Sequence, residues 1–65
     1  MQMQINGRER DIAAGDVAAL LLELGLDSTR VAIELNRAIV LQANFAQTSL
    51  AAGDSIEIVQ FVGGG

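Results

Sequence analysis

A chain of 65 residues allows a single domain with a thin core, because a domain of this size buries only about 60% of the surface of its unfolded chain. Histidine, cysteine, tyrosine, tryptophan, proline and lysine are absent, which excludes disulfides, thiolate metal sites, the strongest nucleophiles and the usual proton shuttle at neutral pH. The net charge is -4 and the four arginines form no basic stripe, so nucleic acid is not expected as a partner.

The first twelve residues predict a β-hairpin. Apolar and polar residues alternate over residues 1–6, which is the period of a half-buried strand. Asn6 and Gly7 follow, and this pair favours a type I′ turn, in which both central residues have φ > 0. The second strand, over residues 8–12, is polar and charged, as is typical of the edge of a sheet.

One amphipathic helix of about nine residues is predicted next. Asp16 can cap its start by accepting hydrogen bonds from the first turn. Four apolar residues recur at i, i+3, i+4 and i+7 and share one face: Val17, Leu20, Leu21 and Leu24. Gly25 stands where a left-handed residue ends a helix, and Leu26 should fold back onto that end. Leu22 falls off the apolar stripe and is expected to be partly exposed.

Three more strands are predicted in the second half of the chain. Residues 31–35 and 38–41 form a hairpin through a tight turn at Asn36 and Arg37, a pair that we interpret as turn chemistry and not as a binding site. Residues 42–50 are irregular, with one helical turn around Phe45. The last strand covers residues 55–62.

This order, β-β-α-β-β-β, predicts an α+β fold of the β-grasp type. A single short helix can cover one face of a mixed five-stranded sheet, with the first and last strands parallel in its middle. We expect residues 1–62 to form this domain and residues 63–65 to form a flexible tail. The expected core is Met3, Ile5, Val17, Leu20, Leu21, Leu24, Val31, Ile33, Leu35, Ile39, Ile56 and Ile58.

The last strand departs from the alternation of a half-buried strand, because apolar residues also occupy its outward face. Val59 and Phe61 are the outward apolar residues. One interpretation is a second small apolar patch closed by the loop that contains Phe45. The other is a docking patch for a partner protein beside the tail, formed by Val59, Phe61 and Val62.

The chain ends in Gly63, Gly64 and Gly65. Glycine has no Cβ and accepts φ of either sign, so such a tail can thread a narrow slot and present its terminal carboxylate. Terminal glycines also fray without any function, and a leftover linker is a further explanation. Since the chain has no lysine, its C-terminus is the expected point of any isopeptide attachment.

Four segments carry a resemblance to a known family: residues 1–7, 17–21, 31–36 and 53–65. Together they resemble the ThiS family, the ubiquitin-like sulfur carriers of thiamine biosynthesis, over nearly the whole chain. Three features together are specific: the compact length, the middle hairpin that bears Asn36, and the ending Phe61-Val62-Gly63-Gly64-Gly65. Asp16 departs from the family, where threonine or serine is common at the helix start, and the loop before the helix is short. Neither departure bears on the chemistry.

The resemblance implies a cycle in which Gly65 is the carrier residue. An E1-like adenylyltransferase uses ATP and Mg²⁺ to convert the Gly65 carboxylate into an acyl-adenylate. A sulfur donor, either a cysteine desulfurase or a persulfide protein, then turns it into a thiocarboxylate, and thiazole synthase receives the sulfur. Gly63 and Gly64 keep the tail narrow enough to thread. The chain itself is then a carrier and not an enzyme, with no catalytic residue, no metal site and no bound cofactor.

Three alternatives stay open: a carrier for molybdopterin synthesis, a ubiquitin-like protein modifier, and an inert β-grasp interaction module. The carboxylates Glu9, Asp11, Glu34 and Glu57 show no acid–base spacing and are interpreted as solvated.

No apolar run approaches the roughly 20 residues that span a membrane, and residues 1–4 lack the features of a signal peptide. We therefore expect a cytoplasmic protein without a membrane partner, monomeric when alone.

Overall fold

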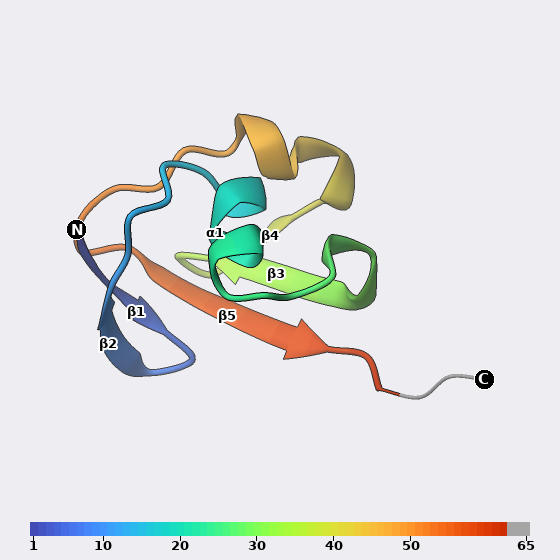
Figure 1. The fold of residues 1–65 in the computed structure, drawn as a ribbon, viewed down its shortest axis with the longest axis horizontal. Coiled ribbons are helices and arrows are strands. Elements are labelled where there is room, and N and C mark those ends of the chain that lie inside the picture. The colour runs from blue at the N-terminus through green and yellow to red at the C-terminus, as the bar shows by residue number, and fades with distance from the viewer. Residues whose placement is uncertain (63–65) are drawn as a thin grey trace.

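The computed structural model of the protein describes residues 1–62, in which five strands form one mixed sheet. The strands are β1 (Gln2–Ile5), β2 (Arg8–Asp11), β3 (Val31–Leu35), β4 (Ala38–Val40) and β5 (Ser55–Gln60). The helical elements are α1 (Val17–Glu23) and the 3-10 helices η1 (Ser28–Arg30) and η2 (Gln42–Gln47) (Figure 1). The predicted order of strands and helix is confirmed, and η1 adds one short helical turn directly before β3.

The sheet has the strand order β2-β1-β5-β3-β4, so the last strand lies in the middle. β1 and β5 are parallel, and the other neighbouring pairs are antiparallel. Figure 1 shows α1 and η2 on the same side of the sheet. The other side of the sheet carries neither of them. This arrangement confirms the predicted β-grasp fold. Within residues 1–62 no helix is both long and apolar enough to cross a membrane.

Both hairpins turn on two residues with positive φ. In the first, Asn6 has φ 52° and Gly7 has φ 82°, which confirms the predicted type I′ turn. In the second, Asn36 has φ 50° and Arg37 has φ 70°. The left-handed conformation is unusual for arginine, because its Cβ crowds the backbone there.

The start and end of α1 follow from the sequence around it. The Asp16 carboxylate accepts a 2.8 Å hydrogen bond from the Ala19 N–H, which confirms the predicted cap. At the other end, Gly25 has φ 73° and donates to the Leu22 carbonyl at 3.1 Å, while the Leu26 N–H donates to the Leu21 carbonyl at 2.8 Å. This pair of bonds is the expected Schellman motif. The motif closes α1 after seven residues, two fewer than predicted.

The core lies between the helical side and the sheet, and most of it was predicted. Its buried members are Met3, Ile5, Ile12, Ala14, Val17, Leu20, Leu21, Val31, Ile33, Phe45, Leu50, Ile56 and Ile58. Leu24 and Leu35 are partly buried against this cluster. Four buried residues were not predicted: Ile12, Ala14, Phe45 and Leu50.

Ile39 was predicted in the core and is instead 78% exposed. The two-residue turn pairs Glu34 with Ile39 and Ile33 with Val40 across the hairpin. Residues that lie directly opposite in an antiparallel pair share a face of the sheet. Since Glu34 points outward, Ile39 does too, and Val40 takes the inward place.

The apolar patch that Phe45 was expected to close does not form. Phe45 is 4% exposed and belongs to the main core, whereas Val59 and Phe61 remain 58% exposed. β5 also ends at Gln60, two residues before the predicted end. Of the two interpretations of the outward apolar residues, only the exposed patch is compatible with this structure.

Candidate functional site

The central strand β5 is held by the amide side chains of two turn residues. On the β1 side, Asn6 Oδ1 accepts from the Ile58 N–H at 2.7 Å, and Asn6 Nδ2 donates to the Ile58 carbonyl at 3.2 Å. The asparagine side chain thereby continues the β1–β5 ladder past the last backbone pair, Ile5 with Ile56. It fixes the half of β5 that leads toward the tail.

Asn36 holds the other end of β5 from the β3 side. Its Oδ1 accepts from the Ser55 N–H at 2.9 Å, and its Nδ2 donates to Asp54 Oδ1 at 3.0 Å. Its backbone N–H donates to the Ser55 carbonyl at 2.7 Å. The prediction that Asn36 serves the turn is therefore confirmed, and the turn also secures the start of β5.

Backbone hydrogen bonds hold the chain in place as far as Phe61. The Phe61 N–H donates to the Arg30 carbonyl at 2.8 Å, one residue after β5 ends. Val62 is 92% exposed. The predicted carrier residue Gly65 and the threading residues Gly63 and Gly64 lie outside the described residues.

The sheet face opposite α1 brings the predicted docking residue Val59 together with residues of the neighbouring strands. Val59 lies directly opposite Ala32 of β3. Val59, Ala32 and Ile39 line one shallow hollow together with Glu34 and Glu57. We call this surface, extended by the exposed Phe61 and Val62, the open face.

Sequence reasoning missed the contribution of β3 and β4 to the open face. The signal was available for Ile39, because a two-residue turn at Asn36 and Arg37 fixes Glu34 opposite Ile39. For Ala32 no such signal existed, since its pairing with Val59 joins strands far apart in the chain.

Two carboxylates lie side by side on the same face. Glu34 of β3 is directly opposite Glu57 of β5, and both are exposed. Within residues 1–62, the salt bridges join other groups, so no cation lies within 4 Å of either carboxylate. Arg37 lines an adjoining hollow with both glutamates.

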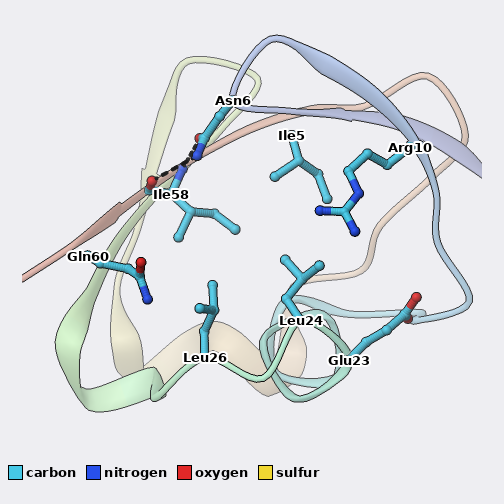
Figure 2. A pocket seen from close by; sticks show the side chains of 8 residues that line it. All are labelled: Ile5, Asn6, Arg10, Glu23, Leu24, Leu26, Ile58 and Gln60. Atoms are coloured by element: carbon cyan, nitrogen blue, oxygen red, sulfur yellow. Dashed lines mark hydrogen bonds between the residues drawn. The ribbon is translucent and has the colours of Figure 1, made fainter.

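A third hollow lies on the helix side of the sheet. Figure 2 shows Arg10 and Glu23 at one end of it and Gln60 at the other. Its apolar lining is Ile5, Leu24, Leu26 and Ile58, and Asn6 adds its amide. Leu24 and Leu26 are half-buried residues packed against the core, so this hollow is largely the incompletely closed edge of that core.

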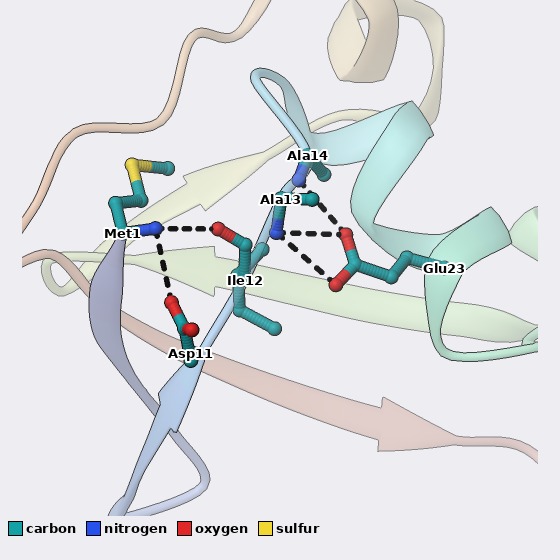
Figure 3. A network of polar contacts seen from close by, with 6 residues as sticks. All are labelled: Met1, Asp11, Ile12, Ala13, Ala14 and Glu23. Carbon is teal, nitrogen blue, oxygen red and sulfur yellow. Dashed lines mark hydrogen bonds and ion pairs between the residues drawn. The ribbon is translucent and has the colours of Figure 1, made fainter.

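The polar contacts near the N-terminus are structural. The Met1 amino group donates to the Ile12 carbonyl at 2.7 Å and to Asp11 Oδ1 at 3.2 Å (Figure 3). The Glu23 carboxylate accepts from the Ala14 N–H at 2.8 Å and from the Ala13 N–H at 3.2 Å. The Met1 bonds hold the N-terminus against the end of β2. The Glu23 bonds tie the loop before α1 to the end of that helix.

The described residues offer a surface and not a set of reactive side chains. Residues 1–62 hold no cluster of three side chains that could bind a metal ion. None of their charged or polar side chains is buried. Asp27 is an exposed carboxylate whose pKa is lowered by hydrogen bonds from the Thr29 hydroxyl and N–H.

Comparison with known proteins gives a consistent family assignment. The model of the ThiS family matches residues 3–65. A thiazole synthase of Paramagnetospirillum magneticum is 50% identical over 66 aligned residues, which cover 100% of this chain and 20% of that protein. A thiazole synthase of Magnetococcus marinus is 36% identical with the same coverage, 100% and 20%. The chain thus spans about a fifth of the length of these curated relatives.

Solved structures show the same fold. The crystal structure of the thiamine biosynthesis protein ThiS from Geobacter metallireducens matches with a TM-score of 0.85 and 29% identity, and the match covers 100% of both chains. A solution structure of a thiamine biosynthesis protein from the same organism matches with a TM-score of 0.81 and 29% identity. That match covers 100% of this chain and 88% of the other.

Proposed function

The chain belongs to the ThiS family, and from that premise we propose that it is a sulfur carrier of thiamine biosynthesis whose reactive group is the carboxylate of Gly65. In the proposed cycle an E1-like adenylyltransferase activates this carboxylate with ATP and Mg²⁺. A sulfur donor, a cysteine desulfurase or a persulfide protein, then replaces AMP. The resulting thiocarboxylate delivers its sulfur to thiazole synthase.

The chemistry explains why a carrier of this kind needs an activating partner. A carboxylate is a poor electrophile, because its charge repels nucleophiles and oxide is a poor leaving group. When the carboxylate oxygen attacks the α-phosphorus of ATP, pyrophosphate leaves and a mixed anhydride with AMP forms. The outer sulfur of the donor's persulfide can then form the C–S bond while the C–O bond to AMP breaks. A second thiol would cleave the S–S bond of the resulting acyl disulfide, which releases the thiocarboxylate and leaves the donor sulfur in a disulfide with that thiol. The residues that catalyse these steps belong to the partner, which also holds ATP and Mg²⁺.

The single observation that carries the proposal is the position of the open face beside the start of the tail. β5 is fixed by Asn6 and Asn36, and its outward residue Val59 is exposed next to Phe61. An exposed apolar patch on a small protein often marks a protein interface. A partner that covers this patch would receive Gly65 at a distance set by only a few residues of chain.

The relatives support thiazole synthase as the acceptor of the sulfur. Two proteins named thiazole synthase contain a counterpart of this whole chain within one polypeptide. A carrier and its acceptor gain effective concentration when they share a polypeptide, which would favour such a fusion if the two act together.

Intact mass spectrometry tests the proposal. The purified chain is incubated with the adenylyltransferase and sulfur donor of the same organism, ATP and Mg²⁺. Exchange of one oxygen for sulfur at the C-terminus is the expected result, and it should require every component. An adduct of the size of a target protein would instead indicate a modifier. An unchanged mass under these conditions would overturn the carrier proposal.

Gly64→Val tests the threading role of the tail. A β-branched side chain adds bulk and restricts φ, so we expect adenylation of this variant to fall at least tenfold. Adenylation of Gly64→Ala, which adds only one methyl group, should fall less than that of Gly64→Val. The measurement is release of pyrophosphate by the adenylyltransferase at saturating ATP. Adenylation of Gly64→Val at the rate of the unchanged chain would refute the threading argument.

A further inference from the structure

The free protein holds two like charges side by side on the open face. Glu34 and Glu57 lie directly opposite each other on β3 and β5. Like charges at directly opposite positions of an antiparallel pair destabilise the sheet. In the order β2-β1-β5-β3-β4, both strands are interior. Charges that prevent edge-to-edge pairing belong on edge strands, so that role does not explain these two glutamates.

Within the described residues Glu34 and Glu57 form no ion pair, although Arg37 lines a hollow with both of them. Arg30 is engaged with Asp27, at 3.7 Å between Nε and Oδ2. The Met1 amino group is engaged with Asp11 at 3.2 Å. Within residues 1–62 no arginine reaches ion-pair distance of Glu34 or Glu57.

The pair lines two hollows, of which one is polar and is completed by Asn36, Arg37 and Ser55. The other hollow is mainly apolar, and Ala32, Ile39 and Val59 line it with the two glutamates. Ile39 and Val59 are among the most exposed large hydrophobic residues of the described chain. A partner that covers these side chains also removes water from both carboxylates. Desolvating a charge without a counter-charge costs several kcal/mol, so a partner of plain apolar character would bind poorly here.

We propose that thiazole synthase presents an arginine to the open face, and that its guanidinium lies between the carboxylates of Glu34 and Glu57 with apolar contacts to Ile39 and Val59 around it. The inference rests on the proposed function and deepens it by naming the chemistry of the partner. A guanidinium carries five donors in a planar fork and is less strongly hydrated than an ammonium, so it can serve two carboxylates at once in a partly apolar setting. The pair that opposes folding in the free protein then becomes favourable in the complex.

The test combines stability and binding in one set of variants. Glu34→Gln, Glu57→Gln and the double variant keep the shape and remove charge. The double variant should bind thiazole synthase of the same organism roughly tenfold or more weakly by calorimetry, with a smaller dependence on salt. Its free form should melt at an equal or higher temperature, because the repulsion across β3 and β5 is gone.

Glu9→Gln is the matched control, since Glu9 is an exposed glutamate on the edge strand β2 and is paired with Gln4. Its affinity should change less than twofold. Equal binding by the double variant and the unchanged chain would overturn the arginine inference and leave the carrier function standing. A lower melting temperature of the double variant would also overturn it, because the pair would then be stabilising in the free protein. Absence of binding by the unchanged chain would remove thiazole synthase as partner, and this inference with it.

Discussion

At the scale of single residues, Asn6 combines two roles that the sequence shows only in part. Its φ of 52° suits the first turn, and the Asn6-Gly7 pair predicted that turn. The hydrogen bonds from its side chain to Ile58 join residues 52 positions apart. No local pattern could have predicted them, because they depend on β1 and β5 becoming neighbours.

We expect Asn6→Gly to lower the free energy of unfolding by about 1–3 kcal/mol, because the Ile58 N–H and carbonyl lose their partly buried partners. Glycine keeps the positive φ available, so the turn itself is retained. Chemical denaturation measures the loss, and hydrogen exchange at Ile58 should accelerate. Asn6→Asp keeps the acceptor and loses the donor. Its free energy of unfolding should lie between those of the unchanged chain and Asn6→Gly. Unchanged stability of Asn6→Gly would mean that water replaces the side chain.

Asp27 makes the stability of the folded protein depend slightly on pH in the acid range. Hydrogen bonds from Thr29 hold the pKa of Asp27 below its usual 3.8. A folded-state pKa below the unfolded value contributes stability above the unfolded pKa, which is lost as the pH falls through the folded pKa. The stability difference between the unchanged chain and Asp27→Asn should therefore be constant near neutral pH and shrink below about pH 4. Melting curves from pH 7 to pH 2 test this, and a difference that grows toward acid would contradict it.

At the scale of elements, the hairpin of β3 and β4 shows how a short turn decides which residues face solvent. The turn fixes the register that sends Ile39 outward and Val40 inward. It also forces Arg37 to a φ of 70°, where a side chain is crowded.

Arg37→Gly should raise the free energy of unfolding by about 0.5–1 kcal/mol, since relief of left-handed strain outweighs the entropy that glycine loses on folding. Arg37→Ala is the matched control, because it removes the same charge and keeps the Cβ. It should not be stabilised. Denaturant titrations of the three proteins give the comparison, and equal stability of the two variants would show that the backbone at Arg37 is unstrained.

Periodicity predicted the elements better than the pairing between them. The helix, its cap at Asp16 and its end at Gly25 follow from local chemistry, and all three were predicted. Phe45 lies in a stretch without regular hydrophobic periodicity, so its burial in the core could not be predicted from the sequence. The exposure of Val59 and Phe61 was visible in the sequence pattern, but the neighbours of Val59 on β3 and β4 depend on long-range register.

At the scale of the whole molecule, the two sides of the sheet are unequal. α1 and η2 cover one side (Figure 1) and enclose the core. On the open face, Val59 and Phe61 are each 58% exposed. A sheet of this size has no second layer to bury that face. Its exposed apolar residues therefore contribute little to the stability of the free protein.

This asymmetry predicts that Phe61→Asp leaves the fold intact and weakens binding to the adenylyltransferase by roughly tenfold or more, because a charge replaces an apolar contact at the interface. Leu22→Asp is the control, since Leu22 is 81% exposed on α1, on the other side of the sheet. Both variants should keep their unfolding free energy within about 0.5 kcal/mol. Only Phe61→Asp should lose affinity in calorimetry. A much lower melting temperature for Phe61→Asp would place Phe61 in the core and remove it from the docking surface.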